Sequence, residues 1–389
     1  MFKHLSLSHL SAGFIAVLVG YTSSAAIVFQ AASAAGAGPA EISSWLWALG
    51  LGMGATCIGL SLAFRTPVLS AWSSPGAALL VTALAGVPMN EAIGAFLCSS
   101  GLIAACGFFG WFDRLMRHVP RTLAAAMLAG VLLRFGLELM ASLQTDLVMV
   151  GGMFVLYLIG RRVLPRYTVP LALAGGLVLA AMQGGIRVEA LQLEFARPLF
   201  TMPAFSVSTL ISVGLPLFIV TMASQNLPGL AVLRANGYTV PAAPLVGWTG
   251  ATGVLLAPFG GFAYNLAAIT AAICMSKDAD PDPARRYLAS VWAGVFYLVT
   301  GVLGATVAGL FAAFPQALIA AIAGLALLGT IANSLAGALA DEGEREAALI
   351  TFLVTASGLT LGGIGSAFWG LVIGLAALQA SRLFRTATQ

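Results

Sequence analysis

Apolar residues occupy most of this chain in long runs, and short polar stretches divide the runs into about fourteen segments. A run of about 20 apolar residues is long enough to cross a bilayer as a helix. The segments lie at residues 11–34, 42–64, 67–87, 90–111, 119–141, 145–163, 168–184, 205–233, 242–256, 257–276, 284–309, 313–339, 346–361 and 364–384. The pattern therefore predicts an all-α polytopic membrane protein with about 14 transmembrane segments.

The third segment does not fit an ordinary membrane helix, because residues 67–80, PVLSAWSSPGAALL, carry two prolines. Pro67 cannot continue a helix from the residues before it, since proline lacks an N–H and clashes with the preceding turn. Pro75 suits the first turn of a new helix, and Ser73 and Ser74 are good N-cap residues. We expect a short extended piece, followed by a half-helix that begins at about Pro75.

A second broken segment, residues 256–269, has the sequence LAPFGGFAYNLAAI. With an offset of 190 residues, Trp72 aligns with Phe262 and Pro75 aligns with Asn265, so we expect the second half-helix to begin near Asn265. A half-helix that starts inside a bilayer directs N–H groups and a positive dipole end at a cavity, which favours an anion. Two such breaks in matching positions indicate the substrate site of a transporter.

The composition agrees with this pattern and excludes several other classes of protein. The 389 residues are 60% hydrophobic and 8% charged, with a mean hydropathy of +0.98, which is typical of helical membrane proteins and not of soluble domains. The net charge of +4 comes from loops and predicts no nucleic-acid partner. The sequence has no P-loop, no Ser/His/Asp set and no Cys/His cluster, so we expect no ATPase, no enzyme, no metal and no cofactor.

Positive charge is distributed unevenly among the loops. With the N-terminus inside, fifteen of the 18 Lys and Arg residues fall in inner loops, two fall in outer loops and Arg134 lies within a segment. Cytoplasmic loops carry an excess of Lys and Arg, so we expect both termini in the cytoplasm. Seven segments on each side of the outer loop at 185–204 give residues 1–184 and 205–389 opposite orientations, which predicts an inverted repeat.

Four stretches resemble the benzoate–proton symporter family of bacterial inner membranes. They are LSAGFIAVLVGYTSSAAIVFQAA near the start, PVLSAWSSPGAALL, VTMASQNLPGLAVLRANGY and LAPFGGFAYNLAAITAAI. The resemblance covers essentially the whole chain. It implies import of benzoate or a similar aromatic carboxylate by proton symport, with elevator-type alternating access. It also implies a fold shared with nucleobase–proton symporters and sulfate-type anion exchangers.

The same resemblance implies how the segments group in space. Spans 1–4 at 11–111 and spans 8–11 at 205–309 form a core, whereas spans 5–7 at 119–184 and spans 12–14 at 313–384 form a gate. Spans 3 and 10 each carry a short strand and a half-helix, with the substrate between them. The connector at 185–204 is then periplasmic. Relatives of this fold are often dimers through the gate, so a homodimer is expected.

Benzoate sets the chemistry of the candidate site, because a carboxylate needs hydrogen-bond donors away from water and an aromatic ring needs an apolar slot. The two half-helix starts supply backbone donors, and nearby side chains add donors and ring contacts. The candidate substrate-binding residues are Tyr21, Ser23, Gln30, Trp72, Ser73, Ser74, Gly76, Gln225, Asn226, Phe262, Tyr264 and Asn265. Helix capping, core packing and satisfaction of a bent backbone are open structural alternatives for many of them.

The predicted core lacks an evident proton carrier. Nucleobase relatives place carboxylates in spans 8 and 10, whereas this sequence has Gln225, Asn226 and Asn265 there. These amides do not titrate, so the site is expected to suit a substrate that brings its own negative charge.

One pair of ionisable residues lies inside a span. Arg134 and Glu138 are four residues apart, so they share a helix face and can form an ion pair. Charges within a membrane span are functional candidates. The pair is either a structural strut or a proton-coupling site in which Glu138 titrates. Asn333 is the corresponding polar candidate in the second half of the gate.

Other functions remain open on the sequence alone. An anion exchanger or uniporter of the same fold would move another organic anion or a nucleobase without needing a proton gradient. A non-transporting sensor would bind a ligand without flux. The absence of carboxylates in spans 8 and 10 argues against a nucleobase carrier, and the absence of a catalytic set argues against an intramembrane enzyme.

Overall fold

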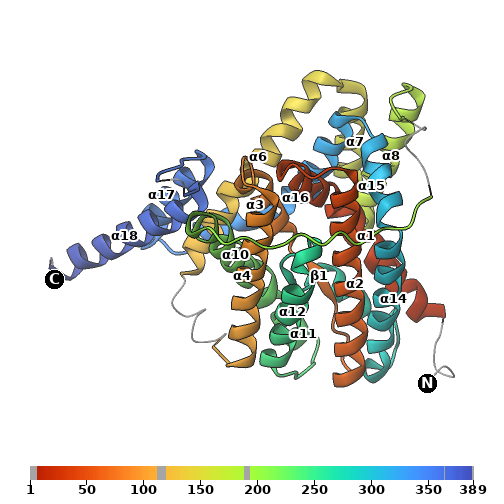
Figure 1. The fold of residues 1–389 in the computed structure, drawn as a ribbon, viewed down its shortest axis with the longest axis horizontal. Helices are drawn as coiled ribbons and strands as arrows, with labels where there is room; N and C mark the ends of the chain where they lie inside the picture. Colours follow the sequence, from red (N-terminus) through yellow and green to blue (C-terminus); the bar gives the residue numbers. More distant parts are fainter. Residues whose placement is uncertain (1–6, 112–119, 188–192, 363, 388–389) are drawn as a thin grey trace.

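The computed structural model describes residues 7–111, 120–187, 193–362 and 364–387. Part of the predicted connector, residues 188–192, and the expected start of the fifth span at residue 119 lie outside these ranges. Within the described ranges the chain is mostly helical, with one two-stranded sheet near the centre of the molecule (Figure 1).

The first half of the chain forms α1 (Leu7–Ala34), α2 (Pro39–Phe64), β1 (Ser70–Trp72), α3 (Ser74–Ala83), α4 (Met89–Phe108), α6 (Arg121–Thr145), α7 (Leu147–Val163), η2 (Pro165–Tyr167) and α8 (Thr168–Met182). The second half forms α9 (Val207–Thr209), η4 (Leu210–Gly214), α10 (Leu215–Thr221), η5 (Met222–Asn226), α11 (Leu227–Ala235), α12 (Ala242–Leu256), η6 (Ala257–Phe259), β2 (Tyr264–Leu266), α13 (Ile269–Cys274), η7 (Pro283–Arg285), α14 (Tyr287–Val302), α15 (Gly304–Ala313), α16 (Gln316–Ala338), α17 (Arg345–Ala356) and α18 (Ser366–Ala387).

Seven helices within the described residues are long and apolar enough to cross a membrane. The helices Pro283–Val302 and Gly304–Ala313, bent by 69° at their junction, add an eighth if they form one span. Shorter apolar helices include α3 and α8. The chain is therefore a multi-pass helical protein, while the count of about fourteen spans and the inverted repeat remain predictions.

The helices pack in pairs from distant parts of the chain. Helix α2 packs against α14, α4 against α12, and α6 against α16 and α17. In Figure 1, α2, α4, α12 and α14 occupy the lower part of the molecule, and α6, α7 and α16 occupy the upper part. Helix α1 contacts α3, α13, α14 and α16, so it lies between these two groups.

The two broken segments meet in the antiparallel pair of β1 and β2. Ala71 lies opposite Asn265 at the centre of the pair, and Ser73 N–H donates to Ala263 O at 3.1 Å beyond its end. Backbone groups inside a bilayer have no water to bond, so each strand must find partners within the protein. The pairing supplies those partners on the inner edges of both strands.

Sulfur atoms from α2 satisfy the outer edge of β1. Ser70 N–H donates to Cys57 Sγ at 3.1 Å, and Trp72 N–H donates to Met53 Sδ at 3.2 Å. These N–H groups point away from β2 and would otherwise be buried without a partner, which costs about 1–3 kcal/mol each. The free, buried Cys57 thiol therefore has a structural role.

The first break follows the sequence prediction, whereas the second does not. Helix α3 begins at Ser74 with Ser73 as its N-cap, as expected. The expectation that a half-helix begins near Asn265 is wrong, because Asn265 lies in β2 and α13 begins only at Ile269. The turn before β2 uses left-handed backbone at Gly260 (φ 91°), where a side chain would collide with a neighbouring indole ring. Because of this turn, α13 begins further along the chain than the sequence pattern predicts.

A buried polar contact between His9 and Asp280 ties α1 to the chain that follows α13. His9 Nε2 lies 2.8 Å from Asp280 Oδ2, and Arg286 Nε donates to Asp280 O at 2.7 Å. Burial raises the pKa of Asp280, but the N–H of Asp282 and the nearby His9 and Arg285 outweigh burial and hold this pKa below its ordinary value. The carboxylate therefore stabilises the fold near neutral pH, and this contribution is lost only as the pH falls through the lowered pKa.

Helices α2 and α14 make a close approach at glycine, and this contact is testable. A Cβ at Gly50 would lie 2.5 Å from Gly301 Cα, whereas a Cβ at Gly59 of the same helix would meet nothing within 4 Å. We expect Gly50→Ala to destabilise the fold by about 1–3 kcal/mol through steric overlap. Gly59→Ala should leave stability unchanged or raise it, because alanine favours helix. Thermal unfolding of both variants in detergent checks this, and equal melting temperatures would contradict the packing.

Candidate functional site

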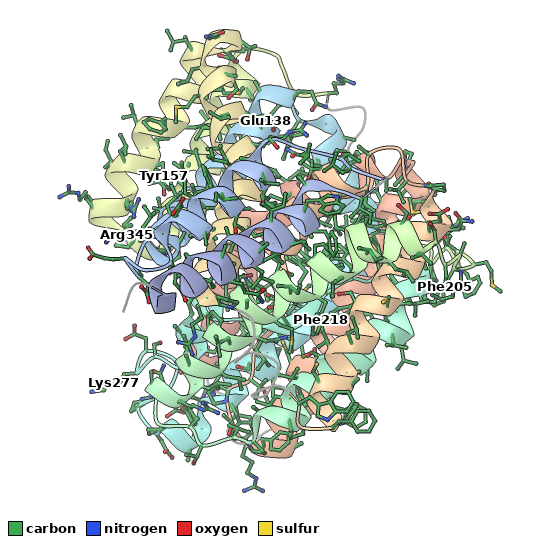
Figure 2. All side chains as sticks on the ribbon, turned by 90° about the vertical axis from the view of Figure 1, so that its left-hand side faces the viewer. Glu138, Tyr157, Phe205, Phe218, Lys277 and Arg345 are labelled. Atoms are coloured by element: carbon green, nitrogen blue, oxygen red, sulfur yellow. The ribbon has the colours of Figure 1, made fainter. Side chains whose placement is uncertain are left out.

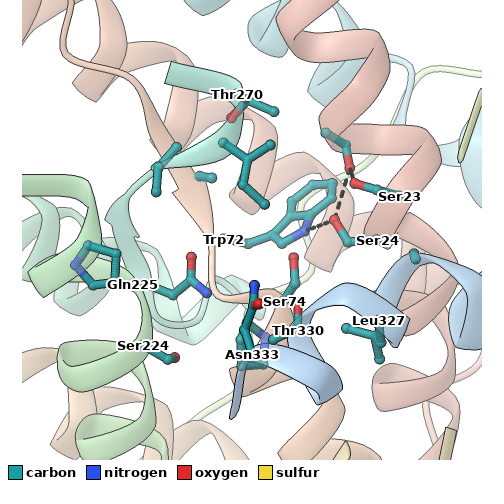
Figure 3. A pocket seen from close by; sticks show the side chains of 18 of the residues that line it. Ser23, Ser24, Trp72, Ser74, Ser224, Gln225, Thr270, Leu327, Thr330 and Asn333 are labelled. Atoms are coloured by element: carbon teal, nitrogen blue, oxygen red, sulfur yellow. Dashed lines mark hydrogen bonds between the residues drawn. The ribbon is translucent and has the colours of Figure 1, made fainter. Parts of the chain in front are cut away.

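A cavity of about 820 Å³ lies beside the β1–β2 pair. Residues from α1, β1, α3, η5 and α13 form one wall, and residues from α6, α8 and α16 form the opposite wall. Its size falls within the range of small-molecule sites. We refer to this space as the central cavity, and Figure 3 shows it from close by.

Trp72 is one of two aromatic residues among the described lining residues of the central cavity, with Tyr297, and its ring is held in place. The indole Nε1–H donates to Ser24 Oγ at 2.8 Å, and Ser24 Oγ in turn donates to Gly20 O at 2.9 Å (Figure 3). Tyr21 packs edge-to-face behind the indole, with ring centroids 4.8 Å apart. The hydrogen bond to Ser24 and the ring contact with Tyr21 together fix the orientation of the indole plane.

The π-helical turn η5 gives neighbouring residues different tasks. Ser224 and Gln225 line the central cavity, whereas Asn226 is fully buried and its Oδ1 accepts the N–H of Leu266 in β2 at 3.0 Å. A π turn inserts an extra residue into a helix and is often found at functional sites. Here it lets one amide face the cavity while the next satisfies the outer edge of β2.

Helix α16 supplies the polar side chains of the opposite wall. Thr330, Asn333 and Ser334 line the central cavity from this helix. Figure 3 shows Gln225 and Asn333 close to each other beside Trp72, with Gln225 reaching in from the left and Asn333 from below. The central cavity therefore combines an indole ring with hydroxyl and amide groups from several helices.

Four of the predicted substrate-binding residues line the central cavity: Ser23, Trp72, Ser74 and Gln225. Tyr21 and Gln30 lie on α1 outside the cavity wall. Asn333, the polar candidate in the second half of the gate, lines the central cavity from α16.

Several other predicted residues lie buried behind the cavity wall. Ser73 Oγ accepts the N–H of Gly76 at 3.0 Å and so caps α3. Asn265 Nδ2 donates to Ala263 O at 3.1 Å within its own strand. Tyr264 O–H donates to a backbone carbonyl of α2 at 2.6 Å. These side chains position the wall and do not line it.

Phe262 also lies outside the central cavity. It is fully buried and packs against Trp45 and Phe96, with ring centroids 5.9 Å and 5.5 Å apart. The alignment of Phe262 with Trp72 therefore does not correspond to a shared role in the cavity wall.

Arg134 and Glu138 form the expected ion pair, with Arg134 Nε 2.6 Å from Glu138 Oε1. Both side chains are partly exposed, at 55% and 36%, and neither lines the central cavity. Figure 2 shows Glu138 near the edge of the molecule, whereas Phe218 lies closer to the middle of the view. The pairing is confirmed, and a role for Glu138 in proton coupling stays a prediction.

The sequence pattern missed several cavity residues. Ser24, Thr270 and Thr330 line the central cavity, and Arg121 adds the single charge among the described lining residues. Ser24 could have been predicted to line the cavity, because it is a small polar residue next to Ser23. Thr330 could not, because nothing in the sequence alone shows that α16 packs against α1. A search of the described residues finds no group of His, Cys, Asp and Glu suited to a metal ion.

Comparison with known families gives a consistent result. A family model described as benzoate membrane transport protein matches residues 3–380. The inner membrane protein YdcO of Escherichia coli K12 is 52% identical over 365 residues, which cover 94% of this chain and 93% of that protein. The benzoate membrane transport protein of Acinetobacter baylyi is 41% identical over 372 residues, which cover 96% of this chain and 94% of that protein.

Solved structures of anion transporters share the fold. The transmembrane domain of the cyanobacterial bicarbonate transporter BicA matches with a TM-score of 0.57 and 16% identity, covering 97% of this chain and 98% of that chain. The murine anion transporter Slc26a9, in its inward-facing state, matches with a TM-score of 0.59 and 13% identity, covering 99% of this chain and 70% of that chain. At these identities the likeness concerns the fold alone.

The bond from Leu266 to Asn226 makes a testable contribution to stability. Asn226→Ala leaves the N–H of Leu266 buried without its acceptor, so we expect a loss of about 1–3 kcal/mol in unfolding free energy. Asn236→Ala is the matched control, because Asn236 is exposed at the end of α11. Thermal unfolding in detergent compares the two. A melting temperature for Asn226→Ala no lower than that of the control would show that β2 does not need this partner.

Proposed function

This chain belongs to the benzoate membrane transport protein family, and on that premise we propose that it imports benzoate or a similar aromatic carboxylate by proton symport. It is a multi-pass membrane protein, and we place it in the bacterial inner membrane with both termini in the cytoplasm. The excess of Lys and Arg in the predicted inner loops supports this orientation.

The observation that carries this proposal is the pairing of an aromatic wall with polar side chains inside one central cavity. Trp72 offers a ring-stacking surface whose plane is fixed by Ser24. Gln225 from η5 and Asn333 from α16 reach the same space (Figure 3). An aromatic carboxylic compound has a flat apolar ring at one end and a polar group at the other, so it matches both features.

The two walls belong to different groups of helices, which supports alternating access. Residues of α1, β1, α3, η5 and α13 belong to the predicted core, and residues of α6, α8 and α16 belong to the predicted gate. We infer that the core, residues 11–111 and 205–309, moves against the gate as a unit. The substrate then travels with the core past the gate in an elevator-type movement.

Uptake of labelled benzoate into proteoliposomes tests the proposal. Protein-free liposomes serve as the blank in every condition, because benzoic acid crosses lipid unaided. We expect protein-dependent accumulation with an inward proton gradient and none when the pH is equal on both sides. Equal protein-dependent flux in both conditions would favour the exchanger or uniporter, and no flux above the blank from folded protein would reject benzoate as substrate.

The bond between Ser24 and Trp72 gives a sharper test of the ring slot. Ser24→Ala removes one neutral hydrogen bond, worth about 0.5–1.5 kcal/mol, so we expect the KM for benzoate to rise about 2- to 10-fold. Trp72→Phe removes the same hydrogen bond by deleting its donor, the indole N–H. The double variant should therefore have the KM of Trp72→Phe alone, as coupled residues do. Additive effects in uptake kinetics would mean that Ser24 acts independently of the indole.

A further inference from the structure

We propose that the central cavity binds the neutral carboxylic acid, so that the substrate itself carries the coupling proton. The inference rests on the proposed function and concerns the form of the substrate that the site accepts. It explains symport without a titrating group of the protein in the cavity.

The polar side chains of the cavity wall suit a neutral acid better than an anion. Beyond Trp72 and Arg121, the polar side chains among the described lining residues are hydroxyls and amides, and none is Asp, Glu, His or Lys. Hydroxyls and amides both donate and accept hydrogen bonds, whereas a carboxylate only accepts. An anion would therefore face acceptor oxygens that it cannot use, while a carboxylic acid offers one donor and one acceptor.

Gln225 has the functional group that complements a carboxylic acid. Its amide carbonyl can accept the acid O–H while its amide N–H donates to the acid C=O, which gives two parallel hydrogen bonds. Asn333 of α16 offers the same pair of groups close to Gln225 (Figure 3). Against a carboxylate, each amide can use only its N–H group, and its carbonyl oxygen is repelled.

Several of the backbone N–H groups expected to hold an anion are already used. At the start of α3, Gly76 N–H donates to Ser73 Oγ at 3.0 Å and Ala77 N–H donates to Ser73 O at 2.7 Å. Pro75 has no N–H, and Ser73 N–H donates to Ala263 O at 3.1 Å. Helix α13 has six residues and a correspondingly short stack of peptide dipoles. The first break therefore leaves few backbone donors for a buried carboxylate, and the second presents its first N–H groups at the end of a short dipole.

Arg121 is the single charged side chain among the described residues that line the central cavity. It is the first residue of α6 and is exposed at the surface of the protein. Water and salt weaken its attraction for an anion held deeper in the cavity. We therefore assign Arg121 no part in holding the acid group beside Gln225.

The proton balance is complete with the substrate alone. Outside, the carboxylate takes a proton from hydronium, which leaves the neutral acid and water. The neutral acid crosses with the protein, and inside it returns the proton to water. One anion and one proton have then crossed together, with no net charge moved and no group of the protein changed. The inward proton gradient drives the cycle because it raises the neutral fraction outside.

Binding to the intact protein in nanodiscs tests the inference without interference from passive leakage. Titration calorimetry measures the affinity for benzoate, benzamide and benzenesulfonate at pH 6, 7 and 8. A carboxylic acid with a pKa of about 4 loses its neutral form about tenfold per pH unit in this range. We expect the apparent Kd for total benzoate to rise about tenfold per unit. Benzamide, which is neutral and planar, should bind with a Kd independent of pH and should compete with benzoate.

Benzenesulfonate decides where the proton resides, because it stays an anion throughout this range. We expect it not to bind. Benzenesulfonate affinity that falls with rising pH as that of benzoate does would place the proton on the protein and overturn the inference. Benzoate binding that is independent of pH, without competition from benzamide, would overturn it as well. Folded protein that binds none of the three ligands at any pH would instead reject the proposed function.

Variants of Gln225 and Arg121 distinguish binding of the acid by the Gln225 amide from binding of the anion by Arg121. Gln225→Leu should weaken benzoate and benzamide about equally, at least 5-fold, while Gln316→Leu, at the exposed start of α16, should leave both unchanged. Arg121→Gln should preserve the pH dependence of benzoate binding. If Arg121→Gln instead abolishes benzoate binding and spares benzamide, the site binds the anion through Arg121 and the inference is wrong.

Discussion

The backbone hydrogen bonds between β1 and β2 fix the point where both broken segments meet. Strands inside a bilayer expose N–H and C=O groups that lipid cannot satisfy, so a two-stranded sheet needs partners on its outer edges too. Cys57 and Met53 provide them for β1, and Asn226 provides one for β2. The wall residues next to the strands, such as Trp72 and Ala267, are positioned by these bonds.

The same constraint shapes the chemistry of the central cavity. The hydrogen bonds that stabilise the breaks use the N–H groups of Gly76 and Ala77 at the start of α3, and the polar side chains that line the cavity are mainly hydroxyls and amides. The site therefore combines a fixed aromatic surface at Trp72 with uncharged polar groups such as Gln225. Such a lining favours a ligand that is flat, apolar at one end and neutral at the other, so transport chemistry and fold stability have a common origin.

Sequence alone located the first break but misplaced the second, for identifiable reasons. Proline leaves an unambiguous local signal, and Pro75 marks the start of α3 within one residue. At the second break, left-handed turns at Gly260 and Ala263 shift the helix start, and Asn265 resembles a cap although it lies in β2. The residues of the cavity wall were harder to predict from the sequence. Thr330, for example, lines the cavity only because helices far apart in the chain pack together.

The position of a bound substrate tests the central claim most directly. Cryo-electron microscopy of the protein with 4-iodobenzoate would locate the ligand by the strong density of iodine. We predict the ring against Trp72, with the carboxyl group between Gln225 and Asn333. Density outside the central cavity, or a carboxyl group bound at Arg121 away from both amides, would contradict this account of the site.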